Sequence, residues 1–135
     1  MKKIILITLL LPFFLFSQNK KSEKKAVKAT EAWLTYIDNY QYSESWKNAG
    51  EYFKNSIQEG RWFSAMKASR EPLGKLIYRK LKSAKYLSYV DGAQDGHYFV
   101  VQFDVSYENK KTAIEIITSQ KEESGAWRVI EYSIK

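Results

Sequence analysis

Two arginines and one glutamate are the residues of this sequence whose chemistry is hardest to explain by solubility alone. Arg79 lies in an apolar run next to Tyr78, and Glu115 lies in a second apolar run further along the chain. A guanidinium that faces the interior of a sheet needs a carboxylate partner, because an unpaired buried charge is strongly destabilising. We expect Glu115 to be this partner, with Asp104 as the second candidate. Arg70 ends a predicted helix, where a cation complements the helix dipole.

Two chemical roles follow for the arginines, and both stay open. Arg70 and Arg79 could hold an anionic ligand together with Glu115. They could instead form structural ion pairs or stack on the ring of Trp62. Replacing Arg79 with methionine separates the two roles. A ligand site would lose its ligand and keep its fold, whereas a buried ion pair would lose stability.

The four tryptophans are the second group of candidates. Trp33, Trp46 and Trp62 lie on apolar stripes of predicted helices, and Trp127 lies in a predicted strand. Large aromatic side chains on such stripes have to be buried, so core packing explains them as well as ligand contact does. Trp46 and Trp62 are retained as candidate ligand-binding residues.

The segment Arg70-Glu71-Pro72-Leu73-Gly74 is predicted to form the corner between the last helix and the first strand. Pro72 disfavours helical geometry at Glu71, so the helix should end there. Gly74 can adopt backbone angles that are closed to other residues. Pro72 and Gly74 are therefore expected to be structural residues of this corner.

Several catalytic and metal-binding chemistries lack the residues that they need. The chain has no cysteine and one histidine, His97, which excludes metal sites built from these ligands and offers no visible partner for a general base. Ser43 and Ser45 have no histidine at the spacing of a nucleophilic triad, and there is no glycine-rich phosphate loop. We predict no metal and no cofactor, and we favour a protein that is not an enzyme.

The first 17 residues have the layout of a secretory signal peptide. Two lysines precede an apolar run over residues 4–16, and the small residue Ser17 follows it. The run is shorter than the roughly 20 residues of a membrane-spanning helix, and Pro12 interrupts it. We expect cleavage after Ser17 and export to the periplasm or beyond the cell, which leaves residues 18–135 as one domain. An uncleaved segment that anchors the chain in a membrane is the alternative.

The positive charge of the chain does not indicate a nucleic-acid partner. The formal net charge is +7, and much of it lies in the segment NKKSEKKAVKAT, while the remainder is scattered among acidic residues. A compact basic motif with interleaved aromatic residues is missing, so a solvated surface explains the charge. Without cysteine the fold depends on packing, for which an aromatic content of 16% is well suited.

Hydrophobic periodicity divides the domain into helices followed by strands. Steps of three and four residues predict a helix over 22–39 with Ser22 as its N-cap. A second helix begins near Ser43 and reaches Gly60, and a third covers residues 61–69.

Alternation with a period of two predicts four strands in the second half, over residues 76–89, 97–107, 112–120 and 126–134. Short connections between successive strands indicate antiparallel hairpins. We predict an α+β domain in which three N-terminal helices pack on a curved four-stranded antiparallel sheet and leave a pocket between the layers. In the last strand, alternation separates Trp127, Val129 and Glu131 from Arg128, Ile130, Tyr132 and Ile134.

The order of motifs along the chain resembles a known family. These motifs are Ala32-Trp33-Leu34, Ile37-Asp38, Tyr42-Ser43-Glu44-Ser45-Trp46, Trp62, Arg70-Glu71-Pro72-Leu73-Gly74, Arg79, Asp95-Gly96-His97-Tyr98, Glu115 and Gly125-Ala126-Trp127-Arg128-Val129. Over residues 26–134 the chain is similar to the domain of unknown function 4019 family, which consists of small exported bacterial proteins. The resemblance implies a cystatin-like, nuclear transport factor 2-like cone. It implies no particular activity, because that fold hosts enzymes, binding modules and assembly domains.

Three functions fit these predictions. The first is a non-enzymatic binding or interaction module. It would hold a small or anionic ligand between helices and sheet, or self-associate through the sheet face that carries Tyr98, Val100 and Gln102. The second is a small cone-pocket enzyme that uses Arg79 and Glu115. The third is a structural component of an envelope assembly. A small molecule and a second copy of the chain are thus the partners considered.

Overall fold

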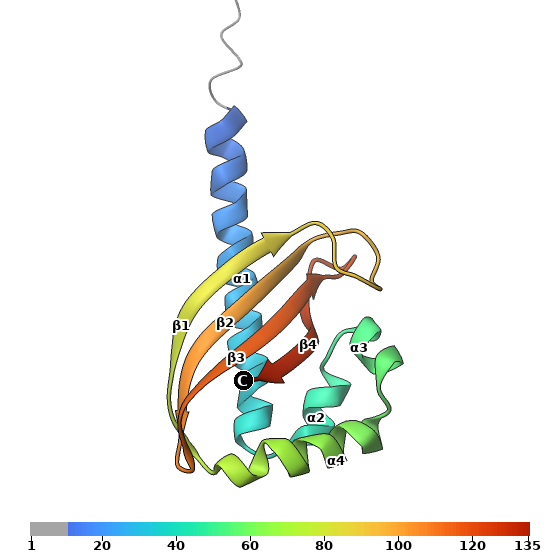
Figure 1. The fold of residues 1–135 in the computed structure, drawn as a ribbon. Helices are drawn as coiled ribbons and strands as arrows, with labels where there is room; N and C mark the ends of the chain where they lie inside the picture. Colours follow the sequence, from blue (N-terminus) through green and yellow to red (C-terminus); the bar gives the residue numbers. More distant parts are fainter. Residues whose placement is uncertain (1–10) are drawn as a thin grey trace, which may run out of the picture.

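The computed structural model describes residues 11–135, with side chains from residue 19 onward. The basic start of the predicted signal peptide lies outside the described residues. Helices come first and an antiparallel sheet follows, which confirms the predicted α+β class (Figure 1). The elements are α1 (Leu11–Asp38), α2 (Tyr42–Lys47), α3 (Glu51–Ser56), α4 (Glu59–Ser69), the 3-10 turn η1 (Glu71–Leu73), β1 (Leu76–Leu87), β2 (Tyr98–Tyr107), β3 (Lys110–Lys121) and β4 (Trp127–Ile134).

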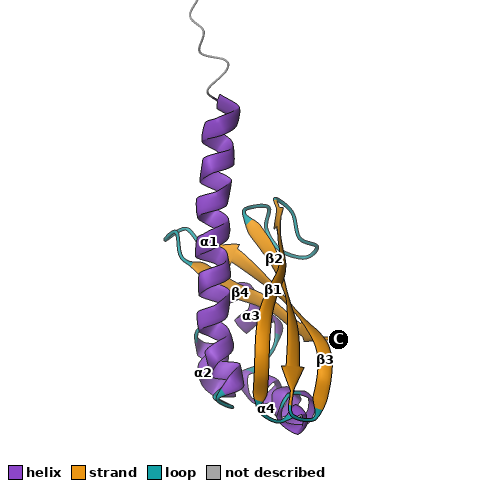
Figure 2. Ribbon diagram, turned by 90° about the vertical axis from the view of Figure 1, so that its left-hand side faces the viewer, coloured by secondary structure: helices purple, strands orange, loops and turns teal. Residues whose placement is uncertain are grey.

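Helix α1 is longer than the sequence predicted. It begins at Leu11 and passes through Ser17 and Ser22 without interruption, so Ser22 is not its N-cap. The segment between these two serines contains neither proline nor glycine, and nothing in it opposes helical geometry. The first part of α1 extends past the sheet, and the second part runs along it (Figures 1 and 2). This second part contacts all four strands.

The predicted second helix is in fact two short helices, α2 and α3, which meet at Gly50. The backbone N–H of Gly50 donates to the carbonyl of Val129 in β4 at 2.7 Å, instead of continuing the helix. A Cβ at this position would lie 3.0 Å from Ile130 Cγ2. The close approach of the helical layer to β4 therefore breaks the helix where the chain has no side chain.

The four strands form a meander in the order β1-β2-β3-β4, with every neighbouring pair antiparallel. This confirms the predicted sheet. The strand ends agree with the predicted ranges to within two residues. Strands β1 and β4 are the two edges of an unclosed, strongly curved sheet (Figure 2).

A β-bulge in β4 reverses the face on which its last residues lie. Thr118 is paired with Glu131, but the next residue of β3 is paired with Val129, so Ile130 is the extra residue. Simple alternation assigned Tyr132 to the face opposite Val129, and this was wrong. Tyr132 and Ile134 pack against the hydrophobic core, as Val129 does, whereas Glu131 is exposed. A bulge shifts the parity of a strand by one residue, which sequence alternation does not reveal.

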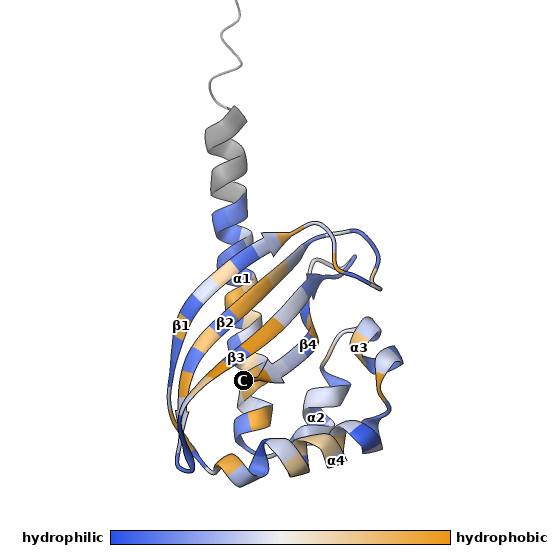
Figure 3. Cartoon of the chain, in the orientation of Figure 1, coloured by the Kyte–Doolittle hydropathy of each residue, from blue (hydrophilic) through white to orange (hydrophobic). Residues whose placement is uncertain are grey.

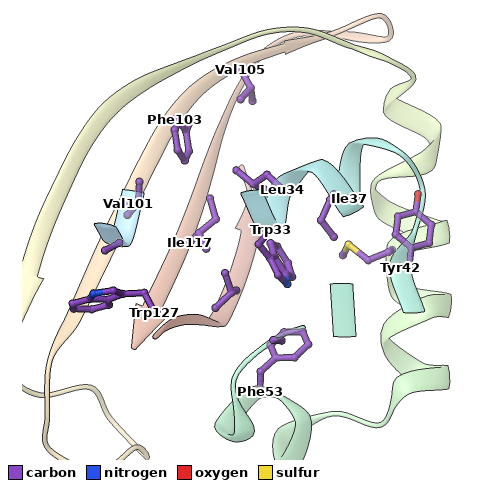
Figure 4. Packing of buried hydrophobic residues seen from close by; sticks show 14 of the residues in the cluster. Trp33, Leu34, Ile37, Tyr42, Phe53, Val101, Phe103, Val105, Ile117 and Trp127 are labelled. Carbon is purple, nitrogen blue, oxygen red and sulfur yellow. The ribbon is translucent and has the colours of Figure 1, made fainter. Parts of the chain in front are cut away.

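The hydrophobic core lies between α1, the short helices and one face of the sheet (Figure 4). Trp33, Leu34 and Ile37 supply the contribution of α1, and they are at most 4% exposed. The central strands β2 and β3 carry the most hydrophobic residues of the sheet, whereas β1 alternates between hydrophilic and hydrophobic ones (Figure 3). Within the described residues, no helix is both long enough and apolar enough to span a bilayer.

The corner between α4 and β1 contains Pro72 within η1, followed by Gly74. Gly74 has a φ of +79°, and a Cβ added to it would lie 2.9 Å from Glu108 Cβ. Its carbonyl accepts a hydrogen bond of 2.6 Å from Arg70 Nη1. The conformation of Gly74 thus aims a backbone acceptor at the end of α4.

We expect Gly74→Ala to lower the free energy of unfolding by at least 1–2 kcal/mol, roughly the cost of a left-handed conformation for a residue with a Cβ. Gly60→Ala is the matched control, because Gly60 lies inside α4 and a Cβ there meets nothing within 4 Å. The control should raise stability by up to about 1 kcal/mol. Urea denaturation measures both values, and shifts of the same sign would contradict this account of the corner.

Candidate functional site

The charged residues singled out in the sequence meet in one buried network. Arg79 of β1 donates from Nε to Glu115 Oε1 at 2.7 Å. It also binds Asp38, the last residue of α1, through Nη1 at 2.7 Å and Nη2 at 2.9 Å. The structure therefore pairs Arg79 with Glu115, as the sequence suggested. Asp104 lies on the other face of β2, because its neighbour Val105 is the residue opposite Arg79.

Glu115 is fully buried in β3, and both of its carboxylate oxygens have partners. Oε1 accepts from Arg79, and Oε2 accepts a 2.6 Å hydrogen bond from the hydroxyl of Tyr132. The bulge at Ile130 makes this second bond possible, because it turns Tyr132 toward the core. A buried carboxylate with both oxygens hydrogen-bonded is well compensated for its loss of hydration.

Arg70 is fully buried at the end of α4. Its Nη2 lies 3.6 Å from Asp38 Oδ1, which joins Arg70 to the same network. The guanidinium carbon lies 4.4 Å from the ring centre of Tyr107 and 5.6 Å from that of Tyr40. Tyr40 is 38% exposed and has a left-handed φ of +58°, so this strained residue places its ring over Arg70 from outside.

The environment shifts the pKa values of the groups around this network. Burial alone would lower the pKa of Arg79, but the hydrogen bonds that Arg79 donates to Asp38 and the charge of Glu115 outweigh it and raise that pKa. Burial, followed by the charge of Glu115, raises the pKa of Tyr132 well above its usual value. The same two causes raise the pKa of Tyr107. The arginine stays charged and both phenols stay neutral at physiological pH.

The network is balanced in charge, with two guanidinium groups and two carboxylates. Each of the three nitrogens of Arg79 donates to a protein carboxylate. These contacts link α1, β1, β3 and β4, and we call this link a structural tie. It carries no excess positive charge. It brings Arg70, Arg79 and Glu115 together, but it does so through protein partners.

The two candidate tryptophans form no hydrogen bond with the charged residues of this network, although the ring of Trp62 packs edge-on against that of Tyr132 with 6.1 Å between the ring centres. Trp62 is buried, and its indole N–H donates to Ser45 Oγ at 2.9 Å. Trp46 is partly buried, and its indole N–H donates to the carbonyl of Ile57 at 2.8 Å. Both rings pack in or against the hydrophobic core, and Trp62 also lines a cleft.

Two clefts lie next to each other along the edge strand β4. One has a volume of about 420 Å³, the other has a volume of about 390 Å³, and both are lined by Tyr132 and Ser133. We call them together the β4 groove. The first cleft is bordered by Phe53, Ile57 and Trp62 of the helical layer, and the second by Met66, Leu73, Lys110 and Lys135.

The remaining candidates from the sequence have local explanations. Tyr98 is fully buried, with hydrogen bonds between its hydroxyl and the carbonyl of Gln94 and the amide of Gln120, while Val100 and Gln102 are half-buried. His97 Nδ1 lies 2.7 Å from the hydroxyl of Tyr86. Within the described part of the chain, the acidic residues and the histidine form no cluster that could hold a metal ion.

Sequence reasoning missed two members of the network, Asp38 and Tyr132. A signal for Asp38 was present: it follows Leu34 by four residues and therefore lies on the buried side of α1. Tyr132 had no usable signal, because strict alternation in β4 gave the opposite face.

The comparison with protein families agrees with the motifs. The model described as "Protein of unknown function (DUF4019)" matches residues 29–132. This match covers most of the chain, and the protein belongs to that family. No curated protein gives a match.

We expect Arg79→Met to lower the free energy of unfolding by about 3–5 kcal/mol, because, among the described residues, Glu115 would lose its only cation and Asp38 would keep only Arg70. Arg128→Met is the control, since Arg128 pairs with Glu122 at the surface. It should cost less than about 1 kcal/mol. Equal stability of wild type and Arg79→Met, measured by urea denaturation, would show that Arg79 is not a structural tie.

Tyr132→Phe removes the donor to Glu115 and should cost about 1.5–3 kcal/mol at pH 7. The raised pKa of Tyr132 in the folded state contributes stability that is fully present below about pH 10 and is lost as the pH rises through the folded value. The variant lacks this contribution, so its stability should fall less steeply than that of wild type above pH 10. Tyr78→Phe, which removes an exposed hydroxyl, should follow the wild-type curve. Parallel curves for wild type and Tyr132→Phe would disprove the assignment.

Proposed function

We propose that this chain is an exported, non-enzymatic binding module that takes its ligand in the β4 groove. Export is supported by the layout of the first 17 residues. The observation that carries the binding site is the groove itself, in which two clefts of about 420 and 390 Å³ share Tyr132 and Ser133. Each cleft lies in the range of volumes that ligand sites occupy.

The complete pairing of Arg79 with protein carboxylates supports the groove over Arg79 as the ligand site. Arg79 directs its nitrogens at Asp38 and Glu115, so an anionic ligand would have to displace a protein carboxylate. A ligand in the groove would not have to displace a carboxylate from Arg79. Its walls are formed largely by apolar and aromatic side chains, including Phe53, Trp62 and Ile130.

The enzymatic alternative draws on the same residues but is less well supported. Tyr132 lies in the groove and contacts Glu115, so a tyrosine does stand beside the pair Arg79 and Glu115. Its proton is already donated to Glu115, and burial raises its pKa well above the usual value. Such a phenol is a poor base at neutral pH and serves as a structural donor.

Native mass spectrometry of the protein, purified gently from an exporting host, tests the proposal. We expect additional mass on the monomer and a polypeptide that begins at Gln18. Ser133→Trp should abolish the additional mass, because Ser133 is exposed and lines both clefts. Ser83→Trp is the matched control, an exposed serine on the other edge strand, and should keep it.

Each other outcome points elsewhere. Additional mass that survives Ser133→Trp would place the ligand outside the groove. A dimer without additional mass would favour self-association. A monomer without any ligand, in wild type and in both variants, would favour a structural role in an envelope assembly.

A further inference from the structure

We infer that the ligand of the β4 groove is an extended peptide segment that adds to β4 as a fifth strand, with an acidic residue at the end near Lys110 and Lys135. This inference rests on the proposed function and names the chemical class of the ligand. It follows from the backbone of β4, from the two clefts beside it and from the charges at the end of the groove.

The backbone groups of the last part of β4 alternate between the sheet and its open edge. Lys135 and Ile114 exchange two backbone hydrogen bonds, of 2.9 and 3.0 Å. In an antiparallel pair, the residue next to such a pair directs its N–H and C=O away from the partner strand. Ile134, opposite Glu115, and Tyr132, opposite Ile117, therefore present their backbone groups to the open edge.

Nearer the start of β4, at Val129, an outward backbone group of this edge is already hydrogen-bonded within the molecule. The carbonyl of Val129 accepts from the N–H of Gly50, so the helical layer covers the edge at that point. Further along β4, no loop or helix among the described residues forms a backbone hydrogen bond with Tyr132 or Ile134. Two donors and two acceptors thus lie along the groove in the pattern that an added strand needs.

The clefts on this edge suit the side chains of such a strand. They follow each other along β4 and share Tyr132 and Ser133. An extended peptide turns successive side chains to opposite sides. A side chain directed toward the helical layer would meet Phe53 and Trp62, and one directed the other way would meet Ile116.

Charge distinguishes the two ends of the groove. The cleft at the end of β4 is lined by Lys110 and Lys135, and neither forms an ion pair with a side chain in the described part of the chain. The other cleft is lined by Glu131. An acidic residue of the peptide therefore belongs near the two lysines, where its charge is complemented.

The opposite edge of the sheet is protected against such addition. Strand β1 has two bulges, in which Ile77 and Lys82 are the extra residues. Lys80 and Lys85 add further charges along it. Bulges and lysines are devices by which proteins prevent pairing at an edge. Between Tyr132 and Ile134, strand β4 has neither a bulge nor a lysine.

A displayed library of random seven-residue peptides, selected on the purified protein, supplies the probe. We expect enrichment of peptides with alternating apolar residues and an acidic residue at one end. Each enriched peptide is then synthesised with N-methyl groups on alternate residues, once in each of the two registers. One register should lose at least tenfold in affinity and the other little, because an added strand directs only every second N–H to β4.

Two measurements on the protein complete the test. Bound peptide should slow hydrogen exchange of the Tyr132 and Ile134 amides. Ile134→Pro should weaken binding at least tenfold, because it removes an outward donor that β3 does not use. Ile134→Val keeps the N–H and should bind as wild type does. The methylated peptides keep the test valid even where the proline variant fails to fold.

The outcomes separate this inference from the proposed function. Peptides that bind in the groove, but tolerate N-methylation in both registers and leave both amides unprotected, would overturn strand addition alone. Strand addition would also be overturned if the selection enriched no peptide on the wild-type protein relative to the Ser133→Trp protein. The proposed function would still stand in that case if native mass spectrometry showed additional mass on the wild type that Ser133→Trp abolishes. Loss of both results would reject the groove as a binding site.

Discussion

The structure depends on one largely buried cation, the guanidinium of Arg79, whose side chain is 12% exposed. It lies between Asp38 at the end of α1 and Glu115 in the middle of β3, and Glu115 in turn holds Tyr132 of β4. Three strands and the longest helix are joined through these contacts. Removing Arg79 leaves Glu115 buried without a cation, which is more costly than the loss of a surface pair.

This network also bears on the binding site that we propose. The two guanidinium groups and the two carboxylates at the centre of the molecule balance one another in charge. The groove that we propose as the binding site lies outside it, along the edge of β4, beside the outward backbone groups of Tyr132 and Ile134. Tyr132 belongs to both regions, since its hydroxyl completes the network and its ring lines the groove. A ligand in the groove that moves the ring of Tyr132 is therefore expected to disturb the hydrogen bond between Tyr132 and Glu115.

Much of the fold could be predicted from periodicity. The four strands, their order and the buried stripe of α1 follow from local patterns, because each element has to bury one apolar face. The pairing of Arg79 with Glu115 followed from the rarity of unpaired buried charge. Local patterns failed at two positions. At Gly50, contact between the helical layer and β4 breaks a helix. At Ile130, a bulge changes the face of the sheet on which the following residues of β4 lie.

The sequence by itself determined the α+β class, the antiparallel meander, the lack of cysteine chemistry and the identity of the central cation. The tertiary structure alone decided which second carboxylate reaches Arg79, which tyrosine reaches Glu115 and which edge of the sheet remains open. The physical reason is that the first set depends on residues close in sequence or on composition. The second set depends on how far β4 bends and where α1 ends against the sheet, and both are fixed only when the layers pack together.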